Sequence, residues 1–303
     1  NQLYSSFQAR LNDFGVNISV ISRFKTNKDR NIIRQNIKQN INDILIGTSA
    51  VLNDSIYFIN SGLIIIDEEH RFGVKQKDFI KKQRDKIDVL SMSATPIPRS
   101  VNLAISNIYS ISMLQTAPLL RRPIYTRIKY FDYEFIKESI LFEVNRGGQI
   151  FFVHNNVDTI VHTTKKLKQL VSSVNIDYIH GQEASKSIET KMGDFIKGKI
   201  HVLVCTSIIE SGIDVPQANC IIINNSHLFG LAQLYQMRGR VGRGGVQAYA
   251  YLLIPKKIQL SNVAYKRIKT IEEKTSLGSG YGVAFADMEI RGGGSLFGYS
   301  QSG

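Results

Sequence analysis

Short apolar runs recur along the chain, each ending in polar residues or glycine and separated from the next by stretches with helical periodicity. Near-continuous apolar runs are typical of strands that are buried on both faces of a parallel sheet. Strands that alternate with helices predict an α/β fold, in which functional groups gather where the strands end. The expected strands are residues 43–47, 63–67, 89–93, 149–153, 201–205 and 220–224.

Two changes in this pattern divide the chain. The first lies between Thr116 and Pro123, where an Ala-Pro pair and two arginines interrupt the alternation of strands and helices. The second follows Pro255, where a helical run rich in Lys and Glu leads into glycine-dense turns and predicts a small helical appendage. A length of 303 residues suits two domains plus such an appendage, so we expect parts at 1–120, 121–255 and 256–303.

Charge and composition narrow the function classes. The chain has 38 basic and 25 acidic residues, and a net charge of +13 favours a polyanionic partner such as nucleic acid or an acidic membrane face. A composition biased toward Lys, Asn and Ile would give the same charge, so charge alone leaves the partner open. No apolar stretch approaches the roughly 18 residues that span a bilayer, and we expect no membrane partner. Cys205 and Cys220 lie in apolar runs, which excludes a disulfide scaffold and indicates a reduced, cytoplasmic setting.

The clearest candidate chemistry is the sequence Leu-Ile-Ile-Ile-Asp-Glu-Glu-His at residues 63–70. An apolar strand that ends in carboxylates places them at the rim of a parallel sheet. There Asp67 can hold a hydrated Mg²⁺ ion and Glu68 can polarise an attacking water. Many strands run into a polar turn without any such role, so this pattern alone leaves both interpretations open.

A second candidate is the arginine box, residues 236–243. Arg240 and Arg243 are three positions apart and share a face if the segment is helical. Two guanidinium groups beside Gly239 and Gly242 suit the clamping of a γ-phosphate. The alternative is a basic surface helix, but glycines are poor helix formers and such a helix would hardly contain two.

These boxes, with Ser-Ala-Thr at 93–95 followed by Pro-Ile-Pro-Arg, occur in the order seen in superfamily 2 helicases and translocases. Residues 67–74, 287–298 and 301–303 resemble more narrowly the bacterial transcription-repair coupling factors, over essentially the whole chain. RecG, the branched-DNA helicase, is the nearest related family, although Gln would be expected there in place of Glu69. The resemblance implies two RecA-like parallel-sheet domains, the first incomplete, followed by a small helical hairpin, with ATP and Mg²⁺ as cofactors.

The resemblance also implies roles for individual residues. Asp67 would hold the metal and Glu68 would activate water, while the two arginines of the box would act as fingers on the nucleotide. The residues expected at the nucleotide or coupled to it are Asp67, Glu68, His70, Ser93, Thr95, Gly212, Asp214, Gln236, Arg240 and Arg243.

For DNA, the resemblance implies that strand-end loops hold backbone phosphates, a task suited to N–H groups and hydroxyls. Arg291 has a structural alternative, because an arginine before glycines can satisfy the last carbonyls of a helix. The residues expected to contact DNA, or to transmit motion to it through the hairpin, are Arg23, Thr48, His180, Thr206, Arg267, Arg291 and Gln301.

One family feature does not occur in the chain. A phosphate-binding loop of the form G-x-x-x-x-G-K-[ST] is absent from all 303 residues, and the chain does not begin with Met. We therefore expect a piece of a longer protein that carries this loop upstream, and we expect the piece alone to be inactive as an ATP hydrolase. The family would engage double-stranded DNA directly, and RNA polymerase and an excision-repair damage-recognition protein through regions outside this chain. The alternatives are a RecG-type remodeller of branched DNA and a non-catalytic remnant that only binds DNA.

Overall fold

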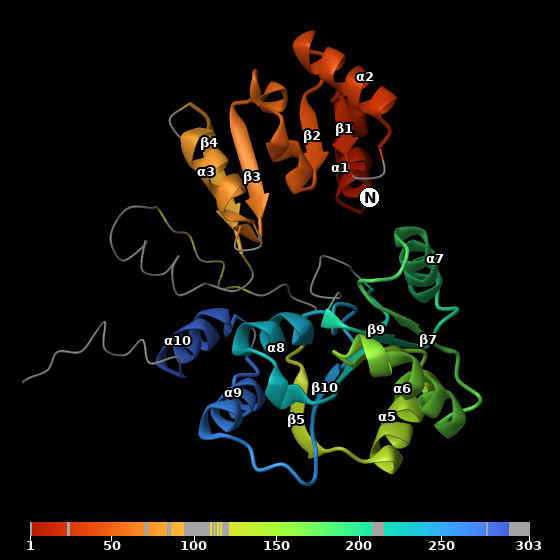
Figure 1. The fold of residues 1–303 in the computed structure, drawn as a ribbon. Helices are drawn as coiled ribbons and strands as arrows, with labels where there is room; N and C mark the ends of the chain where they lie inside the picture. Colours follow the sequence, from red (N-terminus) through yellow and green to blue (C-terminus); the bar gives the residue numbers. More distant parts are fainter. Residues whose placement is uncertain are drawn as a thin grey trace, which may run out of the picture. The chain divides into compact units, whose positions relative to one another are not determined.

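The computed structural model describes residues 2–22, 25–69, 72–83, 86–93, 110, 112, 114, 116, 121–207, 215–276 and 278–290. The chain forms two compact units, residues 1–94 and 95–303 (Figure 1). The finer division at residues 120 and 255 stays a prediction.

The first unit contains two separate parallel strand pairs. Ile18 pairs with Ile44 at the start of one sheet, and Leu63 pairs with Asp88 at the start of the other. The elements in order are α1 (Gln2–Leu11), η1 (Asn12–Phe14), β1 (Ile18–Ile21), α2 (Asn27–Lys38), β2 (Ile44–Gly47), η2 (Ser49–Asn53), η3 (Ser55–Phe58), β3 (Leu63–Asp67), α3 (Val74–Gln83) and β4 (Asp88–Met92).

Helix α2 illustrates how the local sequence sets an element in this unit. Thr26 and Asp29 form a capping box, in which the Thr26 hydroxyl accepts from the Asp29 N–H at 3.2 Å and the Asp29 carboxylate accepts from the Thr26 N–H at 3.1 Å. Ile33 and Ile37, four positions apart, are buried and pack with Ile21 of β1. The cap fixes where the helix begins, and the apolar stripe fixes which side faces the sheet.

The strands predicted in the first unit are confirmed to within one residue at each end, but the predicted burial on both faces is wrong there. In β3, Ile64 and Ile66 are buried whereas Leu63 and Ile65 are about half exposed. The buried residues pack against Ile80 of α3, and this cluster lies on one side of the strand pair. A two-stranded sheet with one covered face gives alternation, even when every residue of the strand is apolar.

The second unit is built on a six-stranded parallel sheet with the order β5-β10-β9-β6-β8-β7. Its elements are β5 (Tyr125–Tyr130), α5 (Tyr133–Asn145), β6 (Gln149–Val153), α6 (Val157–Leu170), β7 (Ile176–Ile179), α7 (Ser185–Ile196), β8 (Val202–Cys205), β9 (Ala218–Ile223), η6 (Ser226–Leu228), α8 (Leu231–Arg238), β10 (Tyr249–Ile254), α9 (Asn262–Glu273) and α10 (Gly280–Ile290). The strands lie between helices in Figure 1.

Here the predicted burial on both faces is confirmed. Strand β6 is buried along its whole length, with Phe151 in one apolar cluster and Ile150 and Phe152 in another. Alternate residues of a strand point to opposite faces, so the two clusters are the two cores of a sheet covered on both sides. Each fully buried Ile or Phe side chain contributes about 1.5–3 kcal/mol, so burial along this sheet stabilises the unit.

The C-terminal helices α9 and α10 form the predicted small helical pair. Ser261 caps α9 by accepting a hydrogen bond from the Ala264 N–H at 3.2 Å. Gly278 adopts a φ of +82° in the connection between the helices, a conformation that glycine reaches without a Cβ penalty. Buried Ile271 and Val283 join the helices to the core on one face of the large sheet.

Both cysteines are buried and free, and burial raises the pKa of each thiol. The described parts of the chain include no helix that is long and apolar enough to cross a membrane.

Candidate nucleotide and DNA site

The acidic box begins where β3 ends. Asp67 is the last residue of the strand and is exposed. Glu68 follows with a φ of +54°, in the left-handed region that a residue with a Cβ seldom occupies. Its N–H donates to the carbonyl of Met92 at 2.9 Å, which extends the β3–β4 ladder by one bond. Such a conformation costs on the order of 1–3 kcal/mol and persists only where the surroundings hold it, as at many functional sites.

A side-chain hydrogen bond joins the acidic box to the next predicted motif. The Ser93 hydroxyl donates to Glu68 Oε2 at 3.1 Å, across 25 residues of sequence. Ser93 directly follows β4, so the parallel pairing of β3 and β4 brings the two strand ends together. Glu69 begins the turn away from the strand, because its carbonyl accepts from the Phe72 N–H at 3.1 Å. The predicted coupling residues His70 and Thr95 lie outside the described residues.

The acidic box fits a magnesium ion that is bound mostly through water and phosphate. No group of three or more potential ligands from His, Cys, Asp and Glu occurs among the residues that the structure describes. Mg²⁺ with a nucleotide keeps several waters and needs only one or two carboxylates from the protein. An exposed Asp67 at the rim of the sheet meets that requirement.

The loop of the first unit that is predicted to contact DNA follows β2. The Thr48 N–H donates to the Ile21 carbonyl at 3.3 Å, and the Thr48 carbonyl accepts from Val51 at 3.0 Å as the chain turns into η2. The Thr48 side chain is exposed at this turn, where a hydroxyl can reach a ligand. The nearby candidate Arg23 falls outside the described residues.

The arginine box of the second unit is helical only in its first part, so Arg240 and Arg243 do not meet the condition for sharing a helix face. Helix α8 ends at Arg238, so Gln236 is helical whereas Arg240 and Arg243 are not. The Arg240 N–H still bonds to Met237 at 3.0 Å, but Gly242 then turns the chain with a φ of +76°. The two arginines therefore do not share a helix face. Gly239 caps the helix in a right-handed conformation with a φ of −66°, and the left-handed turn comes only at Gly242.

Gly242 also meets a packing requirement. A Cβ at this position would lie 2.9 Å from the Cβ of Ala248. Its N–H donates to the Ala218 carbonyl at 3.2 Å, which anchors the turn to the first residue of β9. The glycine thus fixes the path of the backbone between Arg240 and Arg243.

Arg238 is a site residue that the sequence interpretation did not assign. Its side chain is 5% exposed, and Nη1 donates to the Ile271 carbonyl of α9 at 2.7 Å. The guanidinium also lies 5.1 Å from the ring centre of Tyr235. Burial lowers the pKa of Arg238. The only signal in the sequence was its place inside the box, which does not distinguish a buried arginine from an exposed one.

The other candidates of the second unit lie at one edge of the large sheet. His180 follows β7 and Thr206 follows β8, and these strands are parallel neighbours. Thr206 is only 7% exposed, and the next residue, Ser207, donates its N–H to Asn155 Oδ1 at 3.4 Å. Parallel strands bring their carboxyl ends to the same edge, so the structure places these loops together. Gly212 and Asp214 lie outside the described residues.

At the same edge the structure shows a buried histidine that the sequence interpretation missed. His154 follows β6; its Nε2 lies 2.8 Å from Thr159 Oγ1 and its Nδ1 lies 3.0 Å from Asn224 Nδ2. An amide nitrogen donates, so Nδ1 accepts and the proton of the neutral ring sits on Nε2. Burial lowers the pKa of His154. The histidine is thus a neutral link between the ends of β6 and β9.

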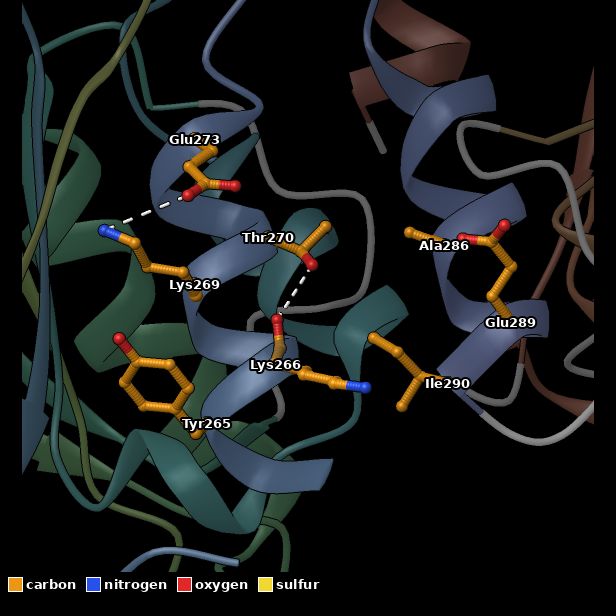
Figure 2. A pocket seen from close by; sticks show the side chains of 8 residues that line it. All are labelled: Tyr265, Lys266, Lys269, Thr270, Glu273, Ala286, Glu289 and Ile290. Carbon is orange, nitrogen blue, oxygen red and sulfur yellow. Dashed lines mark hydrogen bonds and ion pairs between the residues drawn. The ribbon is translucent and has the colours of Figure 1, made fainter. Parts of the chain in front are cut away.

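The helical pair carries an open groove of about 300 Å³ between α9 and α10 (Figure 2). Lys269 lies at its rim and is held by Glu272 at 2.8 Å and Glu273 at 4.0 Å. Arg267 is half-buried on α9 and does not line this groove. The expected hairpin residues Arg291 and Gln301 lie outside the described residues.

Two helicase families match the segments that contain the acidic box and the arginine box. The family described as DEAD/DEAH box helicase matches residues 1–104, which contain the acidic box. The family described as Helicase conserved C-terminal domain matches residues 132–245, which contain the arginine box. The whole chain is similar to the transcription-repair-coupling factor of Haemophilus influenzae, with 46% identity over 302 residues. The chain is thus similar along its whole length to transcription-repair-coupling factors.

The transcription-repair-coupling factor of Myxococcus xanthus is 45% identical over 302 residues. The chain spans about a quarter of the length of these curated relatives, 26% and 25% respectively. Among solved structures, RecG bound to a three-way DNA junction is similar over 97% of this chain and 39% of the RecG chain, with a TM-score of 0.75 and 33% identity. RecG thus shares the RecA-like α/β fold described above.

Proposed function

We propose that this chain is the motor portion of an ATP-dependent translocase on double-stranded DNA, which displaces stalled RNA polymerase and couples transcription to nucleotide excision repair. The proposal is supported by the similarity of the chain to transcription-repair-coupling factors and to two helicase families. It is also supported by the geometry at the acidic box and the arginine box.

The observation that carries the enzymatic part is the position of Glu68. Its backbone is in the left-handed region, its N–H bonds to the Met92 carbonyl, and its carboxylate accepts from the Ser93 hydroxyl. The carboxylate is therefore held at the sheet rim beside Asp67, with one oxygen engaged by the next motif. A general base needs this kind of fixed placement within reach of a water. The bond to Ser93 also supports the expected link between the nucleotide and the segment after β4.

The proposed roles at the nucleotide follow from this placement. Bound ATP with Mg²⁺ would supply the phosphoryl group and the charge that holds its oxygens. Asp67 would hold the metal, and Glu68 would orient and polarise the attacking water. Arg240 and Arg243 would stabilise negative charge on the γ-phosphate. The remaining residues proposed to bind the nucleotide or to respond to it are His70, Thr95, Gly212, Asp214 and Gln236.

The proposed DNA contacts are the strand-end loops. Thr48, His180 and Thr206 each follow a parallel strand, where backbone N–H groups and side-chain donors can meet phosphate oxygens. A net charge of +13 supplies a general attraction to duplex DNA. Arg23 is proposed as a further contact. The helical pair, with Arg267, Arg291 and Gln301, would convert changes at the nucleotide into movement along DNA.

A RecG-type activity on branched DNA is the second candidate, because RecG bound to a three-way junction shares the fold at 33% identity over nearly the whole chain. The higher identity to transcription-repair-coupling factors, 46% and 45%, favours the first candidate. Binding to RNA polymerase and to a damage-recognition protein is proposed for regions of the longer protein outside this chain.

The test uses the longer protein expected to contain this chain and a phosphate-binding loop. It is given ATP and either RNA polymerase halted on duplex DNA or a three-way junction. The proposal predicts release of the polymerase with little change in the junction. Efficient junction remodelling without polymerase release would favour the RecG-type function instead.

A further inference from the structure

Glu183 is the centre of a compact charged cluster behind the His180 loop. Its Oε1 accepts from the His180 backbone N–H at 3.1 Å. Its Oε2 accepts from the Ser187 hydroxyl at 2.9 Å and from Lys191 Nζ at 2.8 Å. The side chains of Glu183 and Lys191 are only 13% and 22% exposed. One carboxylate therefore holds the backbone of the loop and is itself held by α7.

Lys191 has a second attachment on the strand before the loop. Its ammonium donates to the Tyr178 carbonyl at 2.9 Å and lies 4.2 Å from the centre of the Tyr178 ring. The Tyr178 and His180 rings are nearly parallel, with centres 6.0 Å apart and an interplanar angle of 6°. Lys191 thus joins the end of β7, the loop and α7 into one unit, and its geometry is fixed from three sides.

The negative charge of Glu183 is unfavourable next to a loop that is proposed to bind a DNA phosphate. Glu183 lies three residues after His180 in the same connection between β7 and α7. A carboxylate there repels a DNA phosphate bound at His180, and partial burial strengthens the repulsion by lowering the effective dielectric. Burial by itself raises the pKa of Glu183, but donation from Lys191 and Ser187 outweighs it and holds the pKa below its usual value. The carboxylate is therefore charged at neutral pH, and the Lys191 ammonium is the cation that balances it.

We propose that Glu183 and Lys191 form a charge-compensated positioning pair for the loop at His180 and Gly181: Glu183 orients the His180 N–H, and Lys191 makes that carboxylate compatible with a phosphate of duplex DNA. This inference rests on the proposed DNA contact at His180. Neither side chain is a catalytic residue, because both act through the loop backbone.

If Glu183 and Lys191 act as a pair, the effect of removing Lys191 depends on whether Glu183 is still charged. Removal of Lys191 alone leaves a charged carboxylate behind the phosphate, so Lys191→Met weakens duplex binding about fivefold to tenfold. Glu183→Gln keeps an acceptor for His180 and removes the repulsion, so its affinity equals or exceeds that of the unchanged chain. The double variant Glu183→Gln/Lys191→Met returns to within about twofold of the unchanged chain.

The experiment measures binding of the 303-residue chain to a labelled 25-base-pair duplex by fluorescence anisotropy over a series of salt concentrations. Lys191→Arg keeps the charge and is expected to bind like the unchanged chain, which separates charge from folding. The matched control is Lys199→Met, because Lys199 pairs with Asp194 at 3.1 Å on the same unit but is 67% exposed. It is expected to change affinity less than twofold. Recovery in the double variant supports the pair. A double variant as weak as Lys191→Met overturns it and makes Lys191 a direct phosphate contact.

A second measurement separates this inference from the proposed function. Hydrogen exchange at the His180 amide needs no DNA, and Glu183→Ala is expected to accelerate it at least tenfold, whereas Lys199→Met leaves it unchanged. Unchanged protection in Glu183→Ala overturns the positioning role, whatever the DNA result. If the unchanged chain does not bind duplex DNA while His180 exchange responds as expected, the proposed DNA function fails, and with it the role of Lys191 toward phosphate.

Discussion

The guanidinium of Arg238 donates a hydrogen bond from Nη1 to the carbonyl oxygen of Ile271 at 2.7 Å. Arg238 lies in the arginine box and is the last residue of α8, and Ile271 lies in the last turn of α9. The last carbonyls of a helix carry partial negative charge and attract a cation. This bond therefore joins the segment proposed to touch the nucleotide to the helical pair proposed to move on DNA.

Replacement of Arg238 tests that link. Arg238→Met keeps an apolar stem but leaves the Ile271 carbonyl without its charged donor, which costs about 1–3 kcal/mol of local stability. We expect faster amide hydrogen exchange in α9 and α10 and unchanged exchange in β6, β8 and β9. The control is Lys266→Met, on the exposed surface of α9, which is expected to leave all these rates unchanged. Equal protection of α9 in Arg238→Met and in the unchanged chain would show that the bond does not couple the helices.

His154 predicts a dependence of stability on pH. Because burial lowers its pKa, the folded chain takes up the proton at a lower pH than the unfolded chain, whose histidines titrate near pH 6.5. Below about pH 6.5 the unfolded state binds more protons, so the free energy of unfolding falls as the pH falls, by at most about 1.4 kcal/mol per pH unit for one group. Urea unfolding of the second unit at several values between pH 7.5 and 5.5 measures this slope.

The control for the histidine is His154→Gln, which does not titrate in this range. Its stability is expected to fall less steeply between pH 6.5 and 5.5 than that of the unchanged chain. Burial also lowers the pKa of His227, which both proteins retain, so only the difference between the two slopes reports His154. Identical slopes would contradict a buried neutral His154.

Much of the fold follows from the apolar pattern. The expected strands 63–67 and 149–153 coincide with β3 and β6, because four or five consecutive apolar residues before a polar turn have few other stable arrangements. Strands β1, β5, β7 and β10 were not predicted. Strand β5, Tyr125–Tyr130, mixes polar and charged residues with apolar ones because it is an edge strand with exposed side chains. Its sequence therefore lacks a continuous apolar run.

The parts of the candidate site that depend on the local sequence could be predicted, whereas the parts that depend on tertiary packing could not. The sequence placed Asp67 and Glu68 at a strand end, and the structure has them there. It did not show that Ser93 bonds to Glu68, since that contact depends on the pairing of β3 with β4. Nor did it show that Arg238 is buried. The condition under which Arg240 and Arg243 share a helix face is not met, because α8 ends at Arg238 and Gly242 takes a left-handed turn.

The arginine box predicts a large effect on hydrolysis in the longer protein. Arg243→Ala removes a cation proposed to stabilise charge on the transferred phosphoryl group, a role for which loss is expected to slow turnover about 10³-fold to 10⁵-fold. The control is Lys256→Ala, because Lys256 pairs with Asp132 at 3.0 Å on the surface, where both side chains are exposed, and its loss is expected to leave hydrolysis within about threefold. Steady-state ATPase rates at saturating DNA check this. A rate within tenfold of the unchanged protein would remove Arg243 from the nucleotide site.

The 303-residue chain by itself is expected to bind duplex DNA weakly and to hydrolyse no ATP. Contacts to phosphates give micromolar-range affinity that falls with salt, with a slope near −0.9 in log–log form for each phosphate neutralised. No preference for DNA sequence is expected, since the loops at Thr48, His180 and Thr206 are proposed to contact phosphates of the DNA backbone and not the bases. Titrations over a salt series, with and without Mg-ATP, measure both properties. An affinity that shifts with ATP would contradict the expectation that a phosphate-binding loop outside this chain is required.

The central claim is that Glu68 drives movement along duplex DNA by promoting hydrolysis. The most direct measurement is ATP-dependent displacement of a third strand from a duplex track by the longer protein, with Glu68→Gln compared with the unchanged sequence. The amide keeps the shape and the bond from Ser93 but cannot accept a proton from water. The account predicts that the unchanged protein displaces the strand, whereas Glu68→Gln binds ATP and DNA normally yet loses at least 10²-fold in rate. Displacement by Glu68→Gln at close to the unchanged rate would contradict it.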